Sequence, residues 1–138
     1  MEINRFLIAQ NQIYDDVVKE LINGYKRTHW IWFIFPQLIE LSYSEIAKRY
    51  GIKDIHEAIA YWNHPVLQER LKECLTLLLN HANRNASDIL GDTDAQKLRS
   101  CCTLFLAASR GNPLIQEIIN VFYDGVEDPI TKKILSID

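Results

Sequence analysis

Three of the four prolines directly follow a residue whose side chain can cap a helix, and this arrangement constrains the fold more than any other feature of the chain. The pairs are His64-Pro65, Asn112-Pro113 and Asp128-Pro129. Proline fits the first position of a helix, because the N–H group that it lacks would have no partner there, and it disrupts helix interiors and central strands. The sequence therefore predicts three helices, each beginning at one of these prolines.

Elsewhere, apolar residues recur every three or four positions, which is the period of an amphipathic helix. This pattern predicts four more helices, over residues 4–23, 44–50, 54–62 and 92–109, and it extends the helix that begins at Pro65 to about Ala82. For the first of these, Asn4 is a candidate N-cap and Gly24 the expected end, and the helix is either continuous or broken near Gln10. We therefore expect an all-α fold, a compact orthogonal bundle of about six or seven helices in a single domain spanning residues 1–138.

Length and charge limit the classes of protein to consider. At 138 residues, with 48% hydrophobic and 24% charged side chains, the chain can bury a core, and it contains no linker or low-complexity run. Acidic residues outnumber basic ones, 18 to 15, so the sequence lacks the basic surplus with which proteins bind duplex nucleic acid or anionic membranes. These features leave a small-molecule ligand open as a partner.

The sequence also carries no secretory or membrane-spanning signal. Its longest apolar run, Trp30 to Pro36, is far shorter than the roughly 20 residues that a membrane helix needs. Cys74, Cys101 and Cys102 form an odd set, which argues against a disulfide framework and favours reduced thiols and a cytoplasmic location. No pair of Cys and His residues has the short spacing of a zinc site, so we predict neither a metal nor a cofactor.

The stretch from Lys26 to Gln37 is the least ordinary part of the chain. Its bulky residues favour a strand, but no second strand is available for pairing, so we expect a buried helical or irregular segment that ends near Pro36. Two cations and His29 stand directly before Trp30 and Trp32, a combination that can hold a flat ring together with an anionic group. The alternative is that the indole rings fill the core while the cations face solvent.

Two further sets of polar residues could belong to a site. Asp94, Lys97, Ser100 and Thr103 follow one another at steps of three, so they share one face of the predicted helix. That face is either solvated or the wall of a polar pocket. His64 directly precedes a helix-starting proline, and it either caps the following helix or takes part in catalysis. Capping is the simpler interpretation.

Several blocks of residues match one known family, in order along nearly the whole chain. They are Arg5-Phe6 with Ala9-Gln10, Lys26 to Gln37, Glu57-Ala58 with Tyr61, His64 to Leu67 with Arg70-Leu71, Asp94 with Lys97-Leu98, and Ser100 to Phe105. On these blocks the sequence resembles the bacterial family DUF1810, whose members are domains of unknown function. The resemblance implies a compact all-helical fold and no established activity. A compact fold does not suit the calpastatin-like label sometimes given to members.

The sequence departs from the family pattern at a few positions. Thr28 stands where the family more often has Ser, Ile31 replaces Met, and Cys101-Cys102 replaces a Ser-Met pair. The usual glycine-rich turn around residues 40–43 is missing. The resemblance therefore assigns the two adjacent cysteines no role.

We consider two functions for the chain. In the first, it is an enzyme or binder that acts on a nucleotide or an ADP-ribose-like small molecule. Its candidate catalytic residues are His29 and Lys97, and its candidate ligand-binding residues are Lys26, Trp30, Trp32, Gln37, His64, Asp94 and Ser100. In the second, the chain is a non-catalytic protein-interaction or structural module. The first function predicts that the side chains of His29, His64 and Lys97 border one cleft.

Overall fold

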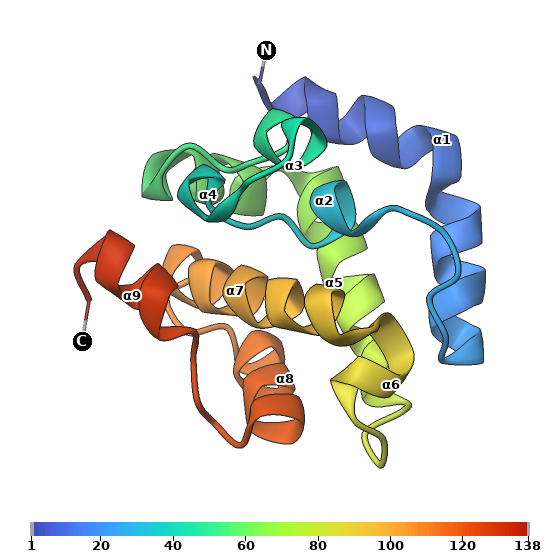
Figure 1. Ribbon diagram of the computed structural model, residues 1–138. Helices are drawn as coiled ribbons and strands as arrows, with labels where there is room; N and C mark the ends of the chain where they lie inside the picture. The colour runs from blue at the N-terminus through green and yellow to red at the C-terminus, as the bar shows by residue number, and fades with distance from the viewer. Residues whose placement is uncertain (1, 138) are drawn as a thin grey trace.

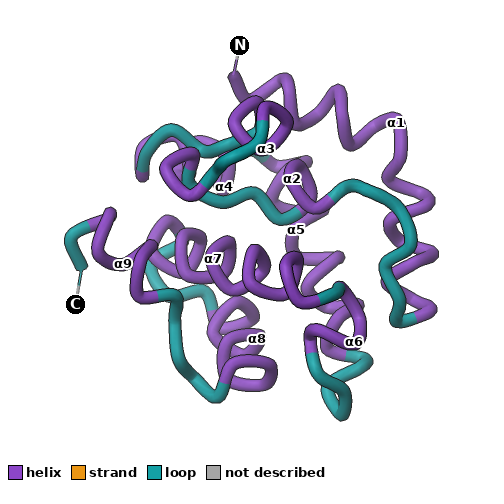
Figure 2. The backbone as a smooth tube through the Cα atoms, viewed as in Figure 1, coloured by secondary structure: helices purple, strands orange, loops and turns teal. Residues whose placement is uncertain are grey.

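The computed structural model describes residues 2–137, and these fold into helices joined by short loops (Figure 1, Figure 2). The helices are α1 (Glu2–Asn23), α2 (Ile31–Ile34), the 3₁₀ helix η1 (Ile39–Leu41), α3 (Glu45–Arg49), α4 (Ile55–Asn63), α5 (Pro65–Leu79), α6 (Ala86–Leu90), α7 (Asp92–Ala108), α8 (Pro113–Tyr123) and α9 (Pro129–Leu135). The predicted all-α class is confirmed, since residues 2–137 form no strand. Residues 1 and 138, which the predicted domain includes, lie outside the described range.

The described part of the chain holds nine α-helices, more than the predicted number of about six or seven. The difference comes from short helices. α2 and α6 span four and five residues, too few to show an apolar period in the sequence. Longer helices lie where the apolar pattern predicts them, within a few residues at each end. α1 already begins at Glu2, so Asn4 lies in its first turn and is not the predicted N-cap.

The three helices that follow a capping residue and a proline begin as predicted. α5, α8 and α9 start at Pro65, Pro113 and Pro129. In each case the side chain of the preceding residue accepts hydrogen bonds from backbone N–H groups of the first turn; the three caps are His64, Asn112 and Asp128. The caps therefore satisfy donors that have no partner inside the helix.

α1 is continuous through Gln10, where the sequence left a break open. The Gln10 side chain is buried, and its amide nitrogen donates to the Phe33 carbonyl oxygen at 2.8 Å and to the Tyr61 hydroxyl at 3.1 Å. Gln10 thus ties α1 to α2 and α4 without interrupting the helix. Gly24 closes α1, as predicted, in the left-handed region with a φ of 74°.

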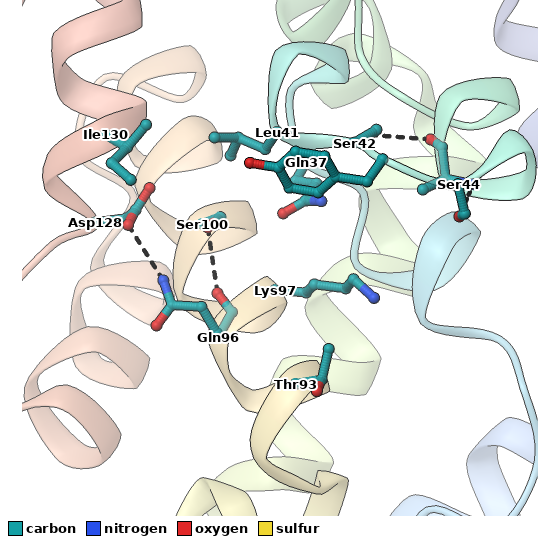
Figure 3. Close-up of a pocket in the computed structure, with 12 residues that line it drawn as sticks. Gln37, Leu41, Ser42, Ser44, Thr93, Gln96, Lys97, Ser100, Asp128 and Ile130 are labelled. Atoms are coloured by element: carbon teal, nitrogen blue, oxygen red, sulfur yellow. Dashed lines mark hydrogen bonds between the residues drawn. The ribbon is translucent and has the colours of Figure 1, made fainter.

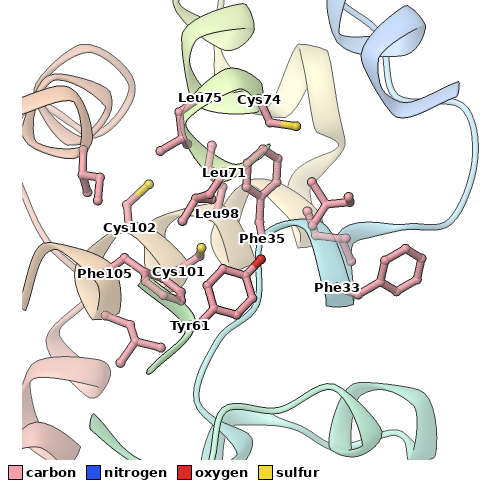
Figure 4. Close-up of a cluster of buried hydrophobic side chains, with 14 of the residues drawn as sticks. Phe33, Phe35, Tyr61, Leu71, Cys74, Leu75, Leu98, Cys101, Cys102 and Phe105 are labelled. Carbon is pink, nitrogen blue, oxygen red and sulfur yellow. The ribbon is translucent and has the colours of Figure 1, made fainter. Parts of the chain in front are cut away.

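The helices pack in two connected groups around one apolar core. α7 contacts α4, α6, α8 and α9, while α1 contacts α2, α4 and α5. In Figure 1, α5 runs down the picture and α7 runs across it, as expected for an orthogonal bundle. The core holds rings from both groups, because the Tyr61 ring centroid lies 5.1 Å from those of Phe6 and Phe105. Figure 4 shows Tyr61 beside Phe105. No helix within residues 2–137 is long and apolar enough to cross a membrane.

The segment after α2 is irregular and is held by two backbone hydrogen bonds. The Ile52 N–H donates to the Gln37 carbonyl oxygen at 2.8 Å, and the Ile39 N–H donates to the Ile52 carbonyl oxygen at 2.8 Å. The prediction of a buried helical or irregular segment ending near Pro36 agrees with the structure, in which the short buried helix α2 ends at Ile34 and irregular backbone follows. These bonds fix the chain that leads through η1 into α3.

Candidate functional site

A pocket of about 530 Å³ lies between three parts of the chain that are distant in sequence (Figure 3). α7 forms one side, the residues before and within α3 form the second, and the start of α9 forms the third. Its lining residues are Gln37, Leu41, Ser42, Tyr43, Ser44, Ala47, Thr93, Gln96, Lys97, Ser100, Asp128 and Ile130. The volume falls within the range of about 300–1,000 Å³ that is typical of small-molecule sites.

Apolar side chains form much of the pocket wall. Leu41, Ala47 and Ile130 supply aliphatic surface, and Tyr43 supplies an aromatic ring that is 94% exposed. A ring with that exposure is accessible for stacking against a ligand ring. Nothing in the sequence marked Tyr43, because its place at the pocket depends on how the loop before α3 turns.

Lys97 is the cation of the pocket. It projects from α7, and its Nζ atom lies 3.8 Å from the Asp94 Oδ1 atom and 5.9 Å from the centroid of the Trp32 ring. Its side chain is 23% exposed, so it is partly shielded from water without being fully buried. Lys97 is a predicted catalytic residue, and Gln37 and Ser100, two of the predicted ligand-binding residues, line the same pocket.

Asp94 is shared between two lysines. The Lys26 Nζ atom lies 2.9 Å from the Asp94 Oδ2 atom, closer than Lys97, and it also donates to the Thr28 carbonyl oxygen at 2.6 Å. The Lys26 side chain is only 7% exposed and lies over the Trp30 ring at 5.1 Å from its centroid. Lys26 is therefore engaged inside the protein, which leaves Lys97 as the lysine that faces the pocket.

Trp30 belongs to the core. Its side chain is 0% exposed, and its indole N–H donates to the Glu20 Oε1 atom at 2.9 Å. Protein atoms cover both faces of the ring, so it has no surface to offer a ligand. Trp32 is half-buried and reaches the site through its contact with Lys97. The two indole rings, both predicted to bind the ligand, therefore lie in different surroundings, and it is the ring of Trp32 that contacts a pocket residue.

Glu20 organises the loop that carries Lys26 and Trp30. This buried carboxylate accepts hydrogen bonds from the Arg27 N–H at 2.7 Å and from the Thr28 hydroxyl at 2.6 Å, as well as from Trp30. Burial alone would raise the pKa of Glu20, but the hydrogen bonds from Thr28, Arg27 and Trp30 outweigh it and lower that pKa to about 2. Glu20 is thus a buried anion held by hydrogen-bond donors.

Glu20 is not among the site residues predicted from the sequence. Its position carried a signal: Glu20 follows Val17 by three residues and precedes Leu21, so it lies on the apolar face of α1. A charged residue on such a face needs partners, because a buried carboxylate without hydrogen bonds is costly.

The two histidines singled out from the sequence do not line the pocket. His29 is exposed in the loop before α2. The His64 Nδ1 atom accepts hydrogen bonds from the N–H groups of Val66 at 3.2 Å and Leu67 at 3.4 Å, which is the capping geometry. Of His29, His64 and Lys97, only Lys97 belongs to the pocket wall.

We expect the replacement of His64 by alanine to lower the free energy of unfolding by about 1 kcal/mol, because two N–H groups of α5 lose their acceptor. His64→Asn keeps an acceptor and should restore most of the loss. Urea denaturation of the two variants measures the difference. Equal stability of His64→Ala and the parent protein would contradict a capping role.

The three thiols lie in the core and are not part of the pocket. Cys74, Cys101 and Cys102 are free and buried (Figure 4). Burial raises the pKa of the Cys74 thiol to about 12 and raises those of Cys101 and Cys102 as well. Within residues 2–137 no three His, Cys, Asp or Glu side chains group closely enough to hold a metal ion.

Comparison with known proteins gives a family match and a structural neighbour. The family model described as "Protein of unknown function (DUF1810)" matches residues 1–135. The fold is similar to the crystal structure of the conserved hypothetical protein Rv1873 from Mycobacterium tuberculosis, with a TM-score of 0.95 and 41% sequence identity over 99% of this chain and 98% of that one. None of the curated proteins compared with the chain matches it.

Proposed function

The chain belongs to the DUF1810 family of proteins of unknown function, and we propose that it binds a small molecule that combines a flat ring with an anionic group. Nucleotides and ADP-ribose-like compounds have this chemistry. The observation that carries the proposal is that Lys97 lines a largely apolar pocket of about 530 Å³ in which it is the one basic residue among the lining residues.

The charges around Lys97 support an anionic ligand. Asp94 is the acidic group within ion-pair distance of Lys97, and Lys26 lies closer to it, at 2.9 Å against 3.8 Å. Two lysines and one aspartate leave one positive charge in this cluster. A cation beside a partly water-excluded pocket attracts an anion more strongly than one in bulk water does.

The ring of the ligand would lie against the apolar wall. Tyr43 offers an exposed aromatic face, and Leu41 and Ile130 offer aliphatic surface beside it. Stacking on an aromatic side chain is worth about 1–3 kcal/mol for a nucleic-acid base. Gln37 and Ser44 add polar groups that can hydrogen-bond a sugar or the ring edge.

The pocket supports binding better than it supports catalysis. The Ser100 hydroxyl donates to the Gln96 carbonyl oxygen at 3.2 Å instead of a base, so it is not arranged as an activated nucleophile. No histidine is among the lining residues. The proposal therefore gives Lys97 a binding role and gives His29 none.

A second candidate is the non-catalytic interaction module. The exposed Tyr43 and Ile130 side chains at the pocket favour it, because a partner protein could cover both. In that case the pocket would show no affinity for nucleotides or ADP-ribose.

Replacing Lys97 by methionine is expected to weaken the binding of AMP and of ADP-ribose by about tenfold or more, because methionine keeps an unbranched side chain of similar shape and removes the charge. Isothermal titration calorimetry measures the affinity. Lys72→Met, which neutralises an exposed lysine of α5 outside the pocket, should bind like the parent protein. Unchanged affinity in Lys97→Met, or no binding of either compound at millimolar concentration, would overturn the proposal.

A further inference from the structure

Asp128 places a buried carboxylate at the pocket wall. The residue is 3% exposed and lines the pocket together with Ile130. Its Oδ2 atom caps α9, where it accepts from the Thr131 N–H at 2.9 Å and from the Thr131 hydroxyl at 2.5 Å. One of its two oxygens is therefore committed to the start of the helix.

The other oxygen accepts a single hydrogen bond from the described residues, which leaves one of its lone pairs unused. The Asp128 Oδ1 atom accepts from the side-chain amide of Gln96 at 3.2 Å. A carboxylate oxygen has two lone pairs, so one remains for another donor. Within residues 2–137, no Lys, Arg or His lies at ion-pair distance from Asp128. The negative charge of Asp128 is thus balanced by neutral donors only.

Asp128 and Lys97 lie at opposite sides of the pocket. In Figure 3, the Asp128 carboxylate is on the side of α9, and the Lys97 side chain extends away from it. The pocket therefore has an anionic end and a cationic end, separated by the apolar surface of residues such as Leu41. A ligand that fills it meets both charges.

We infer that the pocket selects ligands whose ring carries an N–H or amino group at the end opposite the anionic group. Asp128 accepts a hydrogen bond from that N–H or amino group, and Lys97 binds the anionic group. This inference rests on the proposed function and names the class of ring that the pocket prefers. Aminopurine nucleotides such as AMP have this polarity.

The physical basis is the cost of an unmatched buried acceptor. An amino group directed at Asp128 forms a charge-assisted hydrogen bond, which is stronger than one between neutral groups. A ring without that donor fills the pocket and leaves the unused lone pair of the carboxylate without a partner, so it binds more weakly. The discrimination should therefore appear between two ligands that differ only in the amino group.

The test compares AMP with purine riboside monophosphate, in which a hydrogen atom replaces the amino group. Isothermal titration calorimetry of the parent protein should show AMP binding about tenfold more tightly. In Asp128→Asn, an amide oxygen can still cap α9, but an N–H group can face the ligand, so the preference for AMP should disappear. Asp88→Asn, a matched change of an exposed aspartate on α6, should keep the tenfold preference.

The possible results separate this inference from the proposed function. Equal affinities of the two nucleotides for the parent protein would overturn the role of Asp128 and leave the proposed function standing. A preference for AMP that persists in Asp128→Asn would overturn it in the same way. Absence of binding by AMP and by ADP-ribose would overturn the proposed function and this inference together. If Asp128→Asn does not fold, the comparison of the two nucleotides in the parent protein decides.

Discussion

Replacing Glu20 by glutamine is expected to lower the free energy of unfolding at neutral pH by about 3 kcal/mol, because the hydrogen bonds to Glu20 lower its pKa from 4.5 to about 2. Glutamine has nearly the same shape, but one of its two oxygen acceptors becomes an NH₂ group. That group would face the donors of Arg27, Thr28 and Trp30, and some of them would lose their partner in a buried site.

Urea denaturation at neutral pH measures this loss. Asp16→Asn is the matched control, since it neutralises an exposed carboxylate one turn earlier on the same helix, and it should change the stability by less than about 0.5 kcal/mol. A Glu20→Gln variant as stable as the control would show that the hydrogen bonds of Glu20 contribute little.

The same pKa shift predicts how stability depends on pH. The folded-state pKa of Glu20, about 2, lies below its ordinary value of 4.5, so the folded protein holds the carboxylate more strongly than the unfolded chain does. Its contribution is complete above about pH 4.5 and is lost as the pH falls toward 2. In that window the parent protein should lose its advantage over Glu20→Gln. A difference between the two that stays constant would contradict the shift.

Glu20 also links the core to the pocket. It fixes the loop in which the Lys26 side chain turns back to Asp94, and Asp94 lies on the same helix face as Lys97. A variant that loosens this loop would separate Lys26 from Asp94, and Asp94 would then be available to Lys97. Glu20→Gln should therefore weaken the binding of an anionic ligand as well as the fold.

Much of the fold follows from local patterns in the sequence. The prolines at positions 65, 113 and 129 mark helix starts because proline and the preceding side chain act within one turn. α1 and α7 follow from apolar periodicity over many turns. α2 could not be found in this way, because tertiary contacts determine the shape of so short a segment.

The site is harder to predict than the fold, because its parts come from distant segments. The steps of three from Asp94 to Thr103 place Lys97 and Ser100 on one face, and both line the pocket. Thr103 continues the same face but is 0% exposed, and its hydroxyl accepts from the Asp128 N–H at 2.8 Å. Spacing alone cannot show which of these residues meets α9 and which meets the loop at Tyr43.

Replacing Gly51 by alanine is the second change with a large expected effect, and it tests how the pocket wall is held. A Cβ atom at Gly51 would lie 2.6 Å from the Ile39 Cα atom, which is backbone and cannot turn away. Neither segment can shift easily: the Ile39 N–H is bonded to the Ile52 carbonyl oxygen, and the Gly51 carbonyl oxygen accepts from the Arg5 guanidinium at 2.8 Å. We expect a loss of about 3 kcal/mol, the upper part of the usual range for overpacking.

Gly51→Ala should also weaken ligand binding. Ile39 begins η1, which ends at Leu41 and is followed by Tyr43, and both Leu41 and Tyr43 line the pocket. Gly111→Ala is the control: a Cβ atom there meets no atom within 4 Å, so only its φ of 89° costs energy, about 1–2 kcal/mol. Urea denaturation and AMP titration of both variants separate the two effects. Gly51→Ala should be the less stable variant and the only one of the two with weaker AMP binding. If it binds AMP as tightly as Gly111→Ala, the wall formed by Leu41 and Tyr43 does not depend on the contact between Gly51 and Ile39.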